Sequence, residues 1–248
     1  MSLINLEFKE NLRLPYLALL VGMFAISTSA ILIRYSNSEP LVIGTYRQAF
    51  ATLAFLPFIF KDRGAEISSQ SNSTLLEMAL TGILLGAHFS FFITSVKETS
   101  VAASVLLATC HVVYVAILGK IFFGETLSKK AIIGTTVALG GILVLFGGDL
   151  IDNPGNFKGN FYAFVAGVLA GLYYLSGRKL RRTISLPTYA FVVYLFSFIS
   201  MFTVVLIQNL SYENLPISEI RLFLLMALIP TLLGHTMQNW AIGYLPAY

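Results

Sequence analysis

The chain has 248 residues, of which 56% are apolar and only 11% are charged, and its mean hydropathy is +0.79. Soluble domains carry about 25% charged residues, so this composition excludes a soluble globular protein. The net charge of +4 comes from Lys and Arg residues between apolar stretches, so it does not indicate nucleic-acid binding.

Eight apolar stretches follow one another along the chain, each long enough to cross a bilayer. About 20 helical residues at ~1.5 Å per residue span the ~30 Å hydrocarbon core. The predicted spans are Leu14–Ile33, Leu41–Phe60, Leu75–Val96, Thr99–Gly119, Ala131–Gly148, Asn160–Gly177, Pro187–Ile207 and Arg221–Gly243. Transmembrane strands are shorter and alternate polar with apolar residues, so the pattern predicts an all-α polytopic membrane protein.

The basic residues between the spans are unevenly distributed. Eleven lie on the side that holds the N-terminus and four lie on the opposite side. The positive-inside rule therefore predicts a cytoplasmic N-terminus, and we expect a multi-pass protein of the cell (plasma or inner) membrane.

A shift of 147 residues lays spans six, seven and eight on spans one, two and three. The shift pairs Arg34 with Arg181, Pro40 with Pro187, Phe55 with Phe202, Leu85 with Leu232 and His88 with His235. Each repeat has five spans, an odd number, so the second copy enters the membrane from the opposite side. The two copies are therefore inverted relative to each other, as in many secondary transporters. We expect a 5+5 architecture with repeats at 1–148 and 149–248, the second truncated after its third helix because Tyr248 corresponds to Val101.

Three stretches resemble one transporter family. They are Tyr46–Ala51 (YRQAFA), Thr99–Leu106 (TSVAASVL) and Gly124–Ser128 (GETLS), the last followed by Gly134 and Gly140-Gly141. In this order they resemble the EamA-type ten-helix branch of the drug/metabolite transporter superfamily. The resemblance implies transport of small metabolites such as amino acids and nucleosides, with helix nine lining the cavity. The family usually has a proline partway along helix four, whereas this chain has none, so we expect that helix to bend less.

His88 and His235 are the most informative polar residues, because both lie near the middle of a span and are related by the repeat. A pseudo-two-fold axis could bring them to opposite walls of one cavity. Histidine titrates near neutral pH, as proton-coupled transport requires. In the alternative interpretation, each ring bonds a neighbouring backbone carbonyl and stays neutral.

The eighth span is unusually polar after His235. Gln238 and Asn239 follow it by three and four residues and share its helix face, and Trp240 comes next. These side chains suit recognition of a polar solute, or they form interhelical hydrogen bonds worth only ~0.6–2 kcal/mol. Pro230, about one turn before His235, is expected to kink this helix.

Three further side chains are candidates for the cavity wall. Tyr174 in the sixth span aligns with Ser27 in the first, and His111 lies in the fourth span, which resembles a cavity-lining helix of the family. Serine often bonds to its own helix backbone instead.

Two charged residues carry gating or structural expectations. Arg47 is the one charge well inside a span. It either supports an outer gate and attracts a substrate carboxylate, or it has a structural role and snorkels outward or caps helix-end carbonyls. Glu125 lies in the turn between helices four and five, resembles the family glutamate, and is expected to cap helix five or to pair with Lys129.

A transporter of small polar metabolites, an exporter or exchanger of amino-acid-like solutes, explains this pattern best. The alternative substrates are nucleosides, nucleotide sugars and drugs. An intramembrane enzyme is disfavoured because the spans lack paired Asp residues, His-Glu-x-x-His and Gly-x-Ser-x-Gly, and the histidines lack metal-ligand spacing. A receptor or assembly factor predicts larger loops, and a channel predicts a filter segment. We expect no cofactor or metal, with a proton as the possible coupling ion; the partners are the solute and the bilayer.

Overall fold

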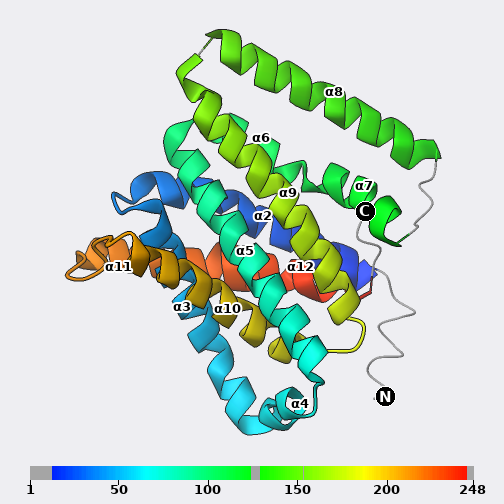
Figure 1. Cartoon of the computed structure of the whole chain (residues 1–248), viewed down its shortest axis with the longest axis vertical. Helices are drawn as coiled ribbons and strands as arrows, with labels where there is room; N and C mark the ends of the chain where they lie inside the picture. The colour runs from blue at the N-terminus through cyan, green and yellow to red at the C-terminus, as the bar shows by residue number, and fades with distance from the viewer. Residues whose placement is uncertain (1–12, 124–128, 153, 245–248) are drawn as a thin grey trace.

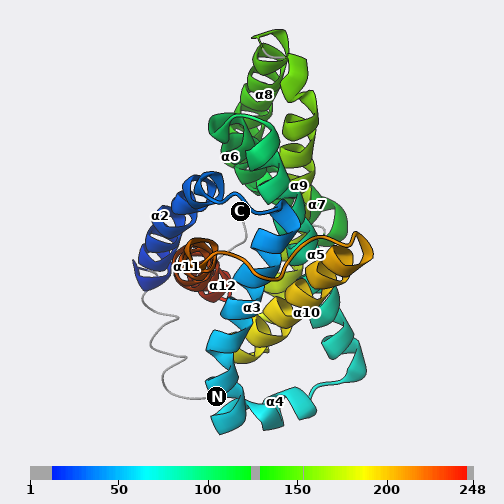
Figure 2. The ribbon, with the colours of Figure 1, turned by 90° about the vertical axis from the view of Figure 1, so that its left-hand side faces the viewer.

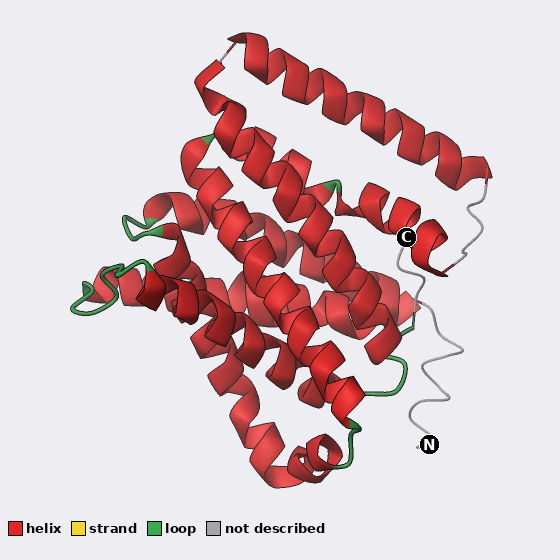
Figure 3. Ribbon diagram, in the orientation of Figure 1, coloured by secondary structure: helices red, strands yellow, loops and turns green. Residues whose placement is uncertain are grey.

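The computed structural model describes residues 13–123, 129–152 and 154–244, and these residues form helices joined by short turns (Figures 1 and 3). In chain order the elements are α2 (Arg13–Tyr35), α3 (Pro40–Phe58), η1 (Ile59–Arg63), α4 (Gly64–Ser68), α5 (Asn72–Glu98), α6 (Val101–Thr109), α7 (His111–Phe123), α8 (Lys129–Asp152), η2 (Pro154–Asn156), α9 (Phe157–Leu180), α10 (Leu186–Ile207), α11 (Ile217–Met226), η3 (Ala227–His235) and α12 (Thr236–Ala241). Here η1 and η3 are π-helical and η2 is a 3-10 turn.

The predicted all-α polytopic fold is confirmed. Each predicted span coincides with a helix or, for the fourth and eighth spans, with consecutive helical segments. Within the described residues, six helical stretches are long and apolar enough to cross a membrane: Arg13–Tyr35, Pro40–Lys61, Asn72–Glu98, Val101–Ile121, Leu186–Ile207 and Ile217–Ala241. The sixth predicted span, α9, is more polar because it carries buried Asn160, Tyr173 and Tyr174, and it packs on α5, α6 and α7.

The helix ends gather at two opposite faces. What we call the N-terminal face holds the start of α2, the short helix α4 and the α9–α10 turn (Figure 1). The far face holds the α2–α3 turn, the α5–α6 turn and the α10–α11 connection, and Figure 2 looks onto it. Two helices begin with serine caps, since Ser71 accepts from the Thr74 N–H and Ser100 accepts from the Ala103 N–H.

Four helix contacts build the core, and each joins an element before α8 to one after it. They are α5 with α9, α5 with α10, α3 with α10, and α2 with η3 and α12. A Cβ added at Gly82 would lie 2.5 Å from the Val193 carbonyl oxygen, and one added at Gly167 would lie 2.8 Å from the Leu107 carbonyl oxygen. These glycines therefore allow close helix packing.

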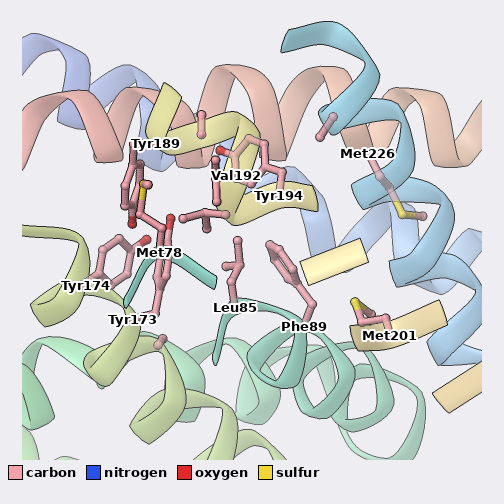
Figure 4. Packing of buried hydrophobic residues seen from close by; sticks show 14 of the residues in the cluster. Met78, Leu85, Phe89, Tyr173, Tyr174, Tyr189, Val192, Tyr194, Met201 and Met226 are labelled. Atoms are coloured by element: carbon pink, nitrogen blue, oxygen red, sulfur yellow. The ribbon is translucent and has the colours of Figure 1, made fainter. Parts of the chain in front are cut away.

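The buried core is rich in aromatic side chains. Figure 4 shows Tyr173 and Tyr174 of α9 with Tyr189 of α10 at one end, and Phe89 of α5 beside Tyr194 toward the other. Tyr173 and Tyr174 lie with ring centroids 4.9 Å apart. Phenol hydroxyls inside a membrane protein need polar partners, so this core also presents polar atoms to the interior.

Two predicted spans are interrupted. The fourth breaks at Cys110, between α6 and α7, although it lacks the proline that the family usually has there. Thr109 and Cys110 bond back to carbonyls one turn earlier, and His111 Nδ1 lies 3.3 Å from the Ala108 carbonyl oxygen. Such side-chain bonds compete with the helix ladder. The eighth span contains Pro230 within the π-helical segment η3, as expected for a proline-distorted helix.

The helix α8 stands apart from the other helices, along α6 and α7 (Figure 1). A cavity of about 490 Å³ separates them and is lined almost wholly by apolar atoms. A Cβ added at Gly140 would meet nothing within 4 Å. In a membrane this apolar space suits lipid chains or another helix, so it is not the candidate site.

Candidate functional site

Buried and half-buried polar side chains meet at the centre of the bundle. We call these residues the central polar cluster: Ser29, Arg47, His88, His111, Tyr173, Tyr174, Tyr194, Thr231, His235, Thr236, Gln238 and Asn239. They come from α2, α3, α5, α7, α9, α10, η3 and α12. The cluster therefore forms only when helices from both ends of the chain pack together.

The two histidines related by the sequence repeat face each other. Their ring centroids lie 6.4 Å apart, and both side chains are buried. His88 Nδ1 lies 2.8 Å from the Ala166 carbonyl oxygen of α9, so that nitrogen carries the proton and donates it. Phe89 meets the His235 ring edge-on, with centroids 5.1 Å apart. The sequence thus located two buried rings that the fold brings into one place.

Tyr174 connects His235 to two other candidates. Its hydroxyl donates to Gln238 Oε1 and lies 3.5 Å from His235 Nδ1. The His111 ring stacks on the Tyr174 ring at 4.9 Å between centroids. The structure therefore places His111, Tyr174, His235 and Gln238 along one continuous path.

A second polar path runs through Asn239. The Tyr173 hydroxyl donates to Asn239 Oδ1 at 2.7 Å, while Asn239 Nδ2 is buried with no hydrogen-bond partner among the described residues. The Tyr194 hydroxyl lies 2.9 Å from Thr236 Oγ1. A buried amide that keeps a free donor is costly unless a further group binds it.

Arg47 supplies the charge of the cluster. Its side chain is 0% exposed, Nε donates to Thr231 Oγ1 at 2.6 Å, and Nη1 donates to Ser29 Oγ at 3.0 Å. The guanidinium carbon lies 4.2 Å from the centroid of the Phe89 ring. The alternative that Arg47 snorkels outward is therefore wrong.

The Arg47 guanidinium lacks an anionic partner. Within the described ranges no carboxylate forms an ion pair with it, and Nη2 has no hydrogen-bond partner there. An uncompensated charge in the interior is expensive, and a guanidinium does not lose its proton in a protein. The site can therefore attract an anionic group.

Three predicted residues lie elsewhere. Ser27 is exposed on α2 and bonds to the Phe24 carbonyl of its own helix. Trp240 stacks near Tyr244 at the end of α12, with centroids 5.0 Å apart. Glu125 lies outside the described residues.

Sequence reasoning missed five members of the cluster, Ser29, Tyr173, Tyr194, Thr231 and Thr236, and the adjoining ring of Phe89. Ser29 lies two residues from the predicted Ser27, about 200° around the helix, so the wrong face of α2 was chosen. The signal was present in Ser27-Thr28-Ser29, but no amphipathic pattern fixed the rotation of this helix. Across the described residues, no group of three His, Cys, Asp or Glu side chains could hold a metal ion.

The fold and the cluster define a multi-pass membrane protein of the transporter class. The model of the EamA-like transporter family matches residues 13–147 and 157–248, and the chain belongs to this family. The resemblance inferred from the motifs is therefore confirmed.

The individual relatives agree at the level of class and fold. Over 122 residues the chain is 29% identical to a protein of Archaeoglobus fulgidus described as an uncharacterized transporter. This match covers 49% of the chain and 42% of that protein, so it spans less than half of the relative's length. A crystal structure with 19% identity has a TM-score of 0.65 and aligns over 92% of this chain and 78% of the other. This likeness concerns the fold alone.

Proposed function

We propose that the protein is a secondary transporter of small polar metabolites, an exporter or exchanger of amino-acid-like solutes, and that the central polar cluster contacts the solute. One observation carries the proposal: the buried Arg47, which has no carboxylate partner among the described residues, lies in the same cluster as the facing rings of His88 and His235. Ionisable groups inside a membrane span typically mark a solute or ion pathway. The cell membrane, with a cytoplasmic N-terminus, is the proposed location.

The chemistry of the cluster favours a solute that carries a carboxylate. Arg47 offers a free Nη2 donor and Asn239 offers a free Nδ2 donor. Arginine binds carboxylates in bidentate geometry. Such a partner would offset the hydration that the guanidinium of Arg47 loses on burial. The amide of Gln238 and the Tyr174 hydroxyl suit a second polar group, as in a zwitterion.

Alternating access around the cluster follows from the proposed inverted repeat, with repeats at 1–148 and 149–248. A pseudo-two-fold axis would map α3 onto α10, and would map the contact of α5 with α9 onto the contact of η3 and α12 with α2. These contacts are among those that build the core. The pairing supports a rocking motion of one repeat against the other.

The histidines are the proposed proton carriers, if transport is coupled. An unperturbed histidine titrates near pH 6.5, within the range of cellular gradients. We propose no catalytic role, because the cluster combines no nucleophile with a base and an oxyanion site in the manner of an enzyme. The proposed partners are a small solute and the lipid bilayer, without nucleic acid, cofactor or metal.

Uptake into proteoliposomes tests the proposal. The full-length protein is reconstituted and supplied with labelled amino acids and nucleosides, with and without an imposed pH gradient. We expect saturable uptake of a carboxylate-bearing amino acid, loss of uptake in His235→Ala and His235→Gln, and little change in the control Ser27→Ala. A response to the gradient would add proton coupling. Folded protein that transports none of these solutes would contradict the amino-acid assignment.

A further inference from the structure

Glu66 ties the two halves of the chain together at the N-terminal face. Its Oε1 accepts from the Ser185 N–H at 2.9 Å, and its Oε2 accepts from the hydroxyls of Ser185 at 2.5 Å and Thr188 at 2.7 Å. Burial alone would raise the pKa of this carboxyl, but the bonds from Ser185 and Thr188 and the charge of Arg63 outweigh burial and hold the pKa below its ordinary value. We call this set of contacts the N-face latch.

Glu219 makes the corresponding tie at the far face. Its Oε1 accepts from the Asn37 N–H at 3.0 Å, and its Oε2 accepts from the hydroxyls of Ser36 and Ser38, the latter at 2.8 Å. Lys97 of α5 donates to the Ser36 carbonyl and adds a third helix to the junction. We call the contacts of Glu219 with Ser36, Asn37 and Ser38 the far-face latch.

The two latches share one design. In each, a glutamate accepts one backbone N–H on one oxygen and two hydroxyls on the other. The shift of 147 residues that relates the two halves places Ser38 on Ser185. Each glutamate comes from the segment between the second and third spans of one half and binds residues just before or at the start of the second span of the other half. The pair is therefore arranged as an inverted repeat requires, one latch at each face.

The strength of such contacts suits a gate. Hydrogen bonds to an ionised carboxylate are stronger than neutral ones, and each latch concentrates three of them on one side chain. Elsewhere the halves meet mainly through long apolar helix faces, together with the Arg47–Thr231 contact and the partly exposed pairs Glu77–Lys179 and Glu98–Lys158. The latches lie at the two opposite faces of the bundle, and the central polar cluster lies between these faces. A polar pocket of about 400 Å³ adjoins the far-face latch and includes Ser38 and Lys97 in its lining.

We propose that Glu66 and Glu219 are reciprocal gating residues. The N-face latch opens while the far-face latch stays closed, and the far-face latch opens while the N-face latch stays closed. The proposal rests on the proposed transport function, since only alternating access requires the two faces to open in turn. The hydrogen bonds of both latches are formed in this structure. The latches act on the path of the solute and do not touch it.

Two other carboxylates provide matched controls. Glu77 at the N-terminal face pairs with Lys179 at 2.8 Å, and Glu98 at the far face pairs with Lys158 at 3.4 Å. Like the latches, both pairs link the two halves, here by joining α5 to α9. These two helices already pack along their length, and the charges of both pairs are partly exposed. Exposed pairs contribute little, so neutralising them should not open either face.

Distance measurements between spin labels test the proposal without any solute. Cys110 is the single cysteine of the 248-residue chain, so Cys110→Ser gives a label-free background. One double-cysteine variant, Ser69→Cys with Thr183→Cys, reports on the N-terminal face. A second variant, Asn37→Cys with Ser218→Cys, reports on the far face. All four positions are exposed.

In the full-length protein in lipid nanodiscs, Glu66→Gln should raise the long-distance population of the N-terminal pair about tenfold or more relative to the short one. It should leave the far-face pair closed. Glu219→Gln should do the reverse, whereas Glu77→Gln and Glu98→Gln should leave both pairs unchanged. Ser185→Ala combined with Thr188→Val should reproduce the effect of Glu66→Gln.

The outcomes separate gating from transport. Reciprocal opening would support the latches even if the uptake panel contained no substrate. Opening of both faces together in either variant, or no change in either, would overturn the proposal even if uptake were robust. An equal response in the control variants would also overturn it, because the effect would then follow from lost surface charge.

Discussion

Gly82 lies so close to α10 that a single added methyl group tests the packing of the bundle. In Gly82→Ala the new Cβ would lie 2.5 Å from the Val193 carbonyl oxygen and 2.7 Å from the Phe196 Cβ. Both atoms are fixed by the α10 backbone, so the helices must separate by roughly 1 Å to reach a van der Waals separation of about 3.5 Å. Overpacking costs about 1–3 kcal/mol, and the higher helix propensity of Ala returns up to ~1 kcal/mol.

We therefore expect Gly82→Ala to lower the free energy of unfolding by about 1–2 kcal/mol, or the Tm by about 2–8 °C. The matched control is Gly140→Ala, where the new Cβ meets nothing within 4 Å. The control should be neutral or stabilised by up to ~1 kcal/mol. Thermal unfolding of the purified protein in detergent, followed by far-UV circular dichroism, measures both. Equal or higher stability of Gly82→Ala would refute the close contact of α5 with α10.

Three further predictions concern polar contacts. Tyr173→Phe removes the donor to Asn239 and should cost about 1–2 kcal/mol of stability, measured in the same melts. The lowered pKa of Glu66 means that its latch contributes near neutral pH and is lost as the pH falls through that value, below the ordinary 4.5. The Tm difference between wild type and Glu66→Gln should thus shrink from about pH 6 to about pH 3. Glu77→Gln, which breaks a partly exposed pair with Lys179, should change stability by less than ~1 kcal/mol.

The sequence predicts the helices well because each helix must form all the hydrogen bonds of its own backbone inside the membrane. Long apolar runs therefore mark the spans, and Pro230 marks the irregular segment η3. The break at Cys110 has no such marker. It arises where three consecutive side chains bond to backbone carbonyls, a competition that apolar patterning does not reveal.

The central polar cluster was partly predictable for a related reason. His88 and His235 stand out because polar residues are rare in membrane helices, and the repeat suggested that they face each other. The rotation of a helix around its axis is not encoded when both faces are apolar, so Ser27 was chosen where Ser29 contacts Arg47. The latch glutamates were missed because a Glu or Ser between predicted spans is ordinarily solvated, and only the fold brings Glu219 to Ser36.

Accessibility of Ser29 to water from both sides of the membrane tests the central claim, that the cluster is a solute site with alternating access. In the Cys110→Ser background, Ser29→Cys and the matched control Ser27→Cys are treated in proteoliposomes with a charged, impermeant thiol reagent, added outside or trapped inside. We predict that Ser29→Cys reacts from both sides and is protected by a transported solute, whereas the exposed Ser27→Cys, which faces lipid, does not react. Failure of Ser29→Cys to react from either side, in protein that transports its solute, would contradict the account and make the cluster part of the packed core.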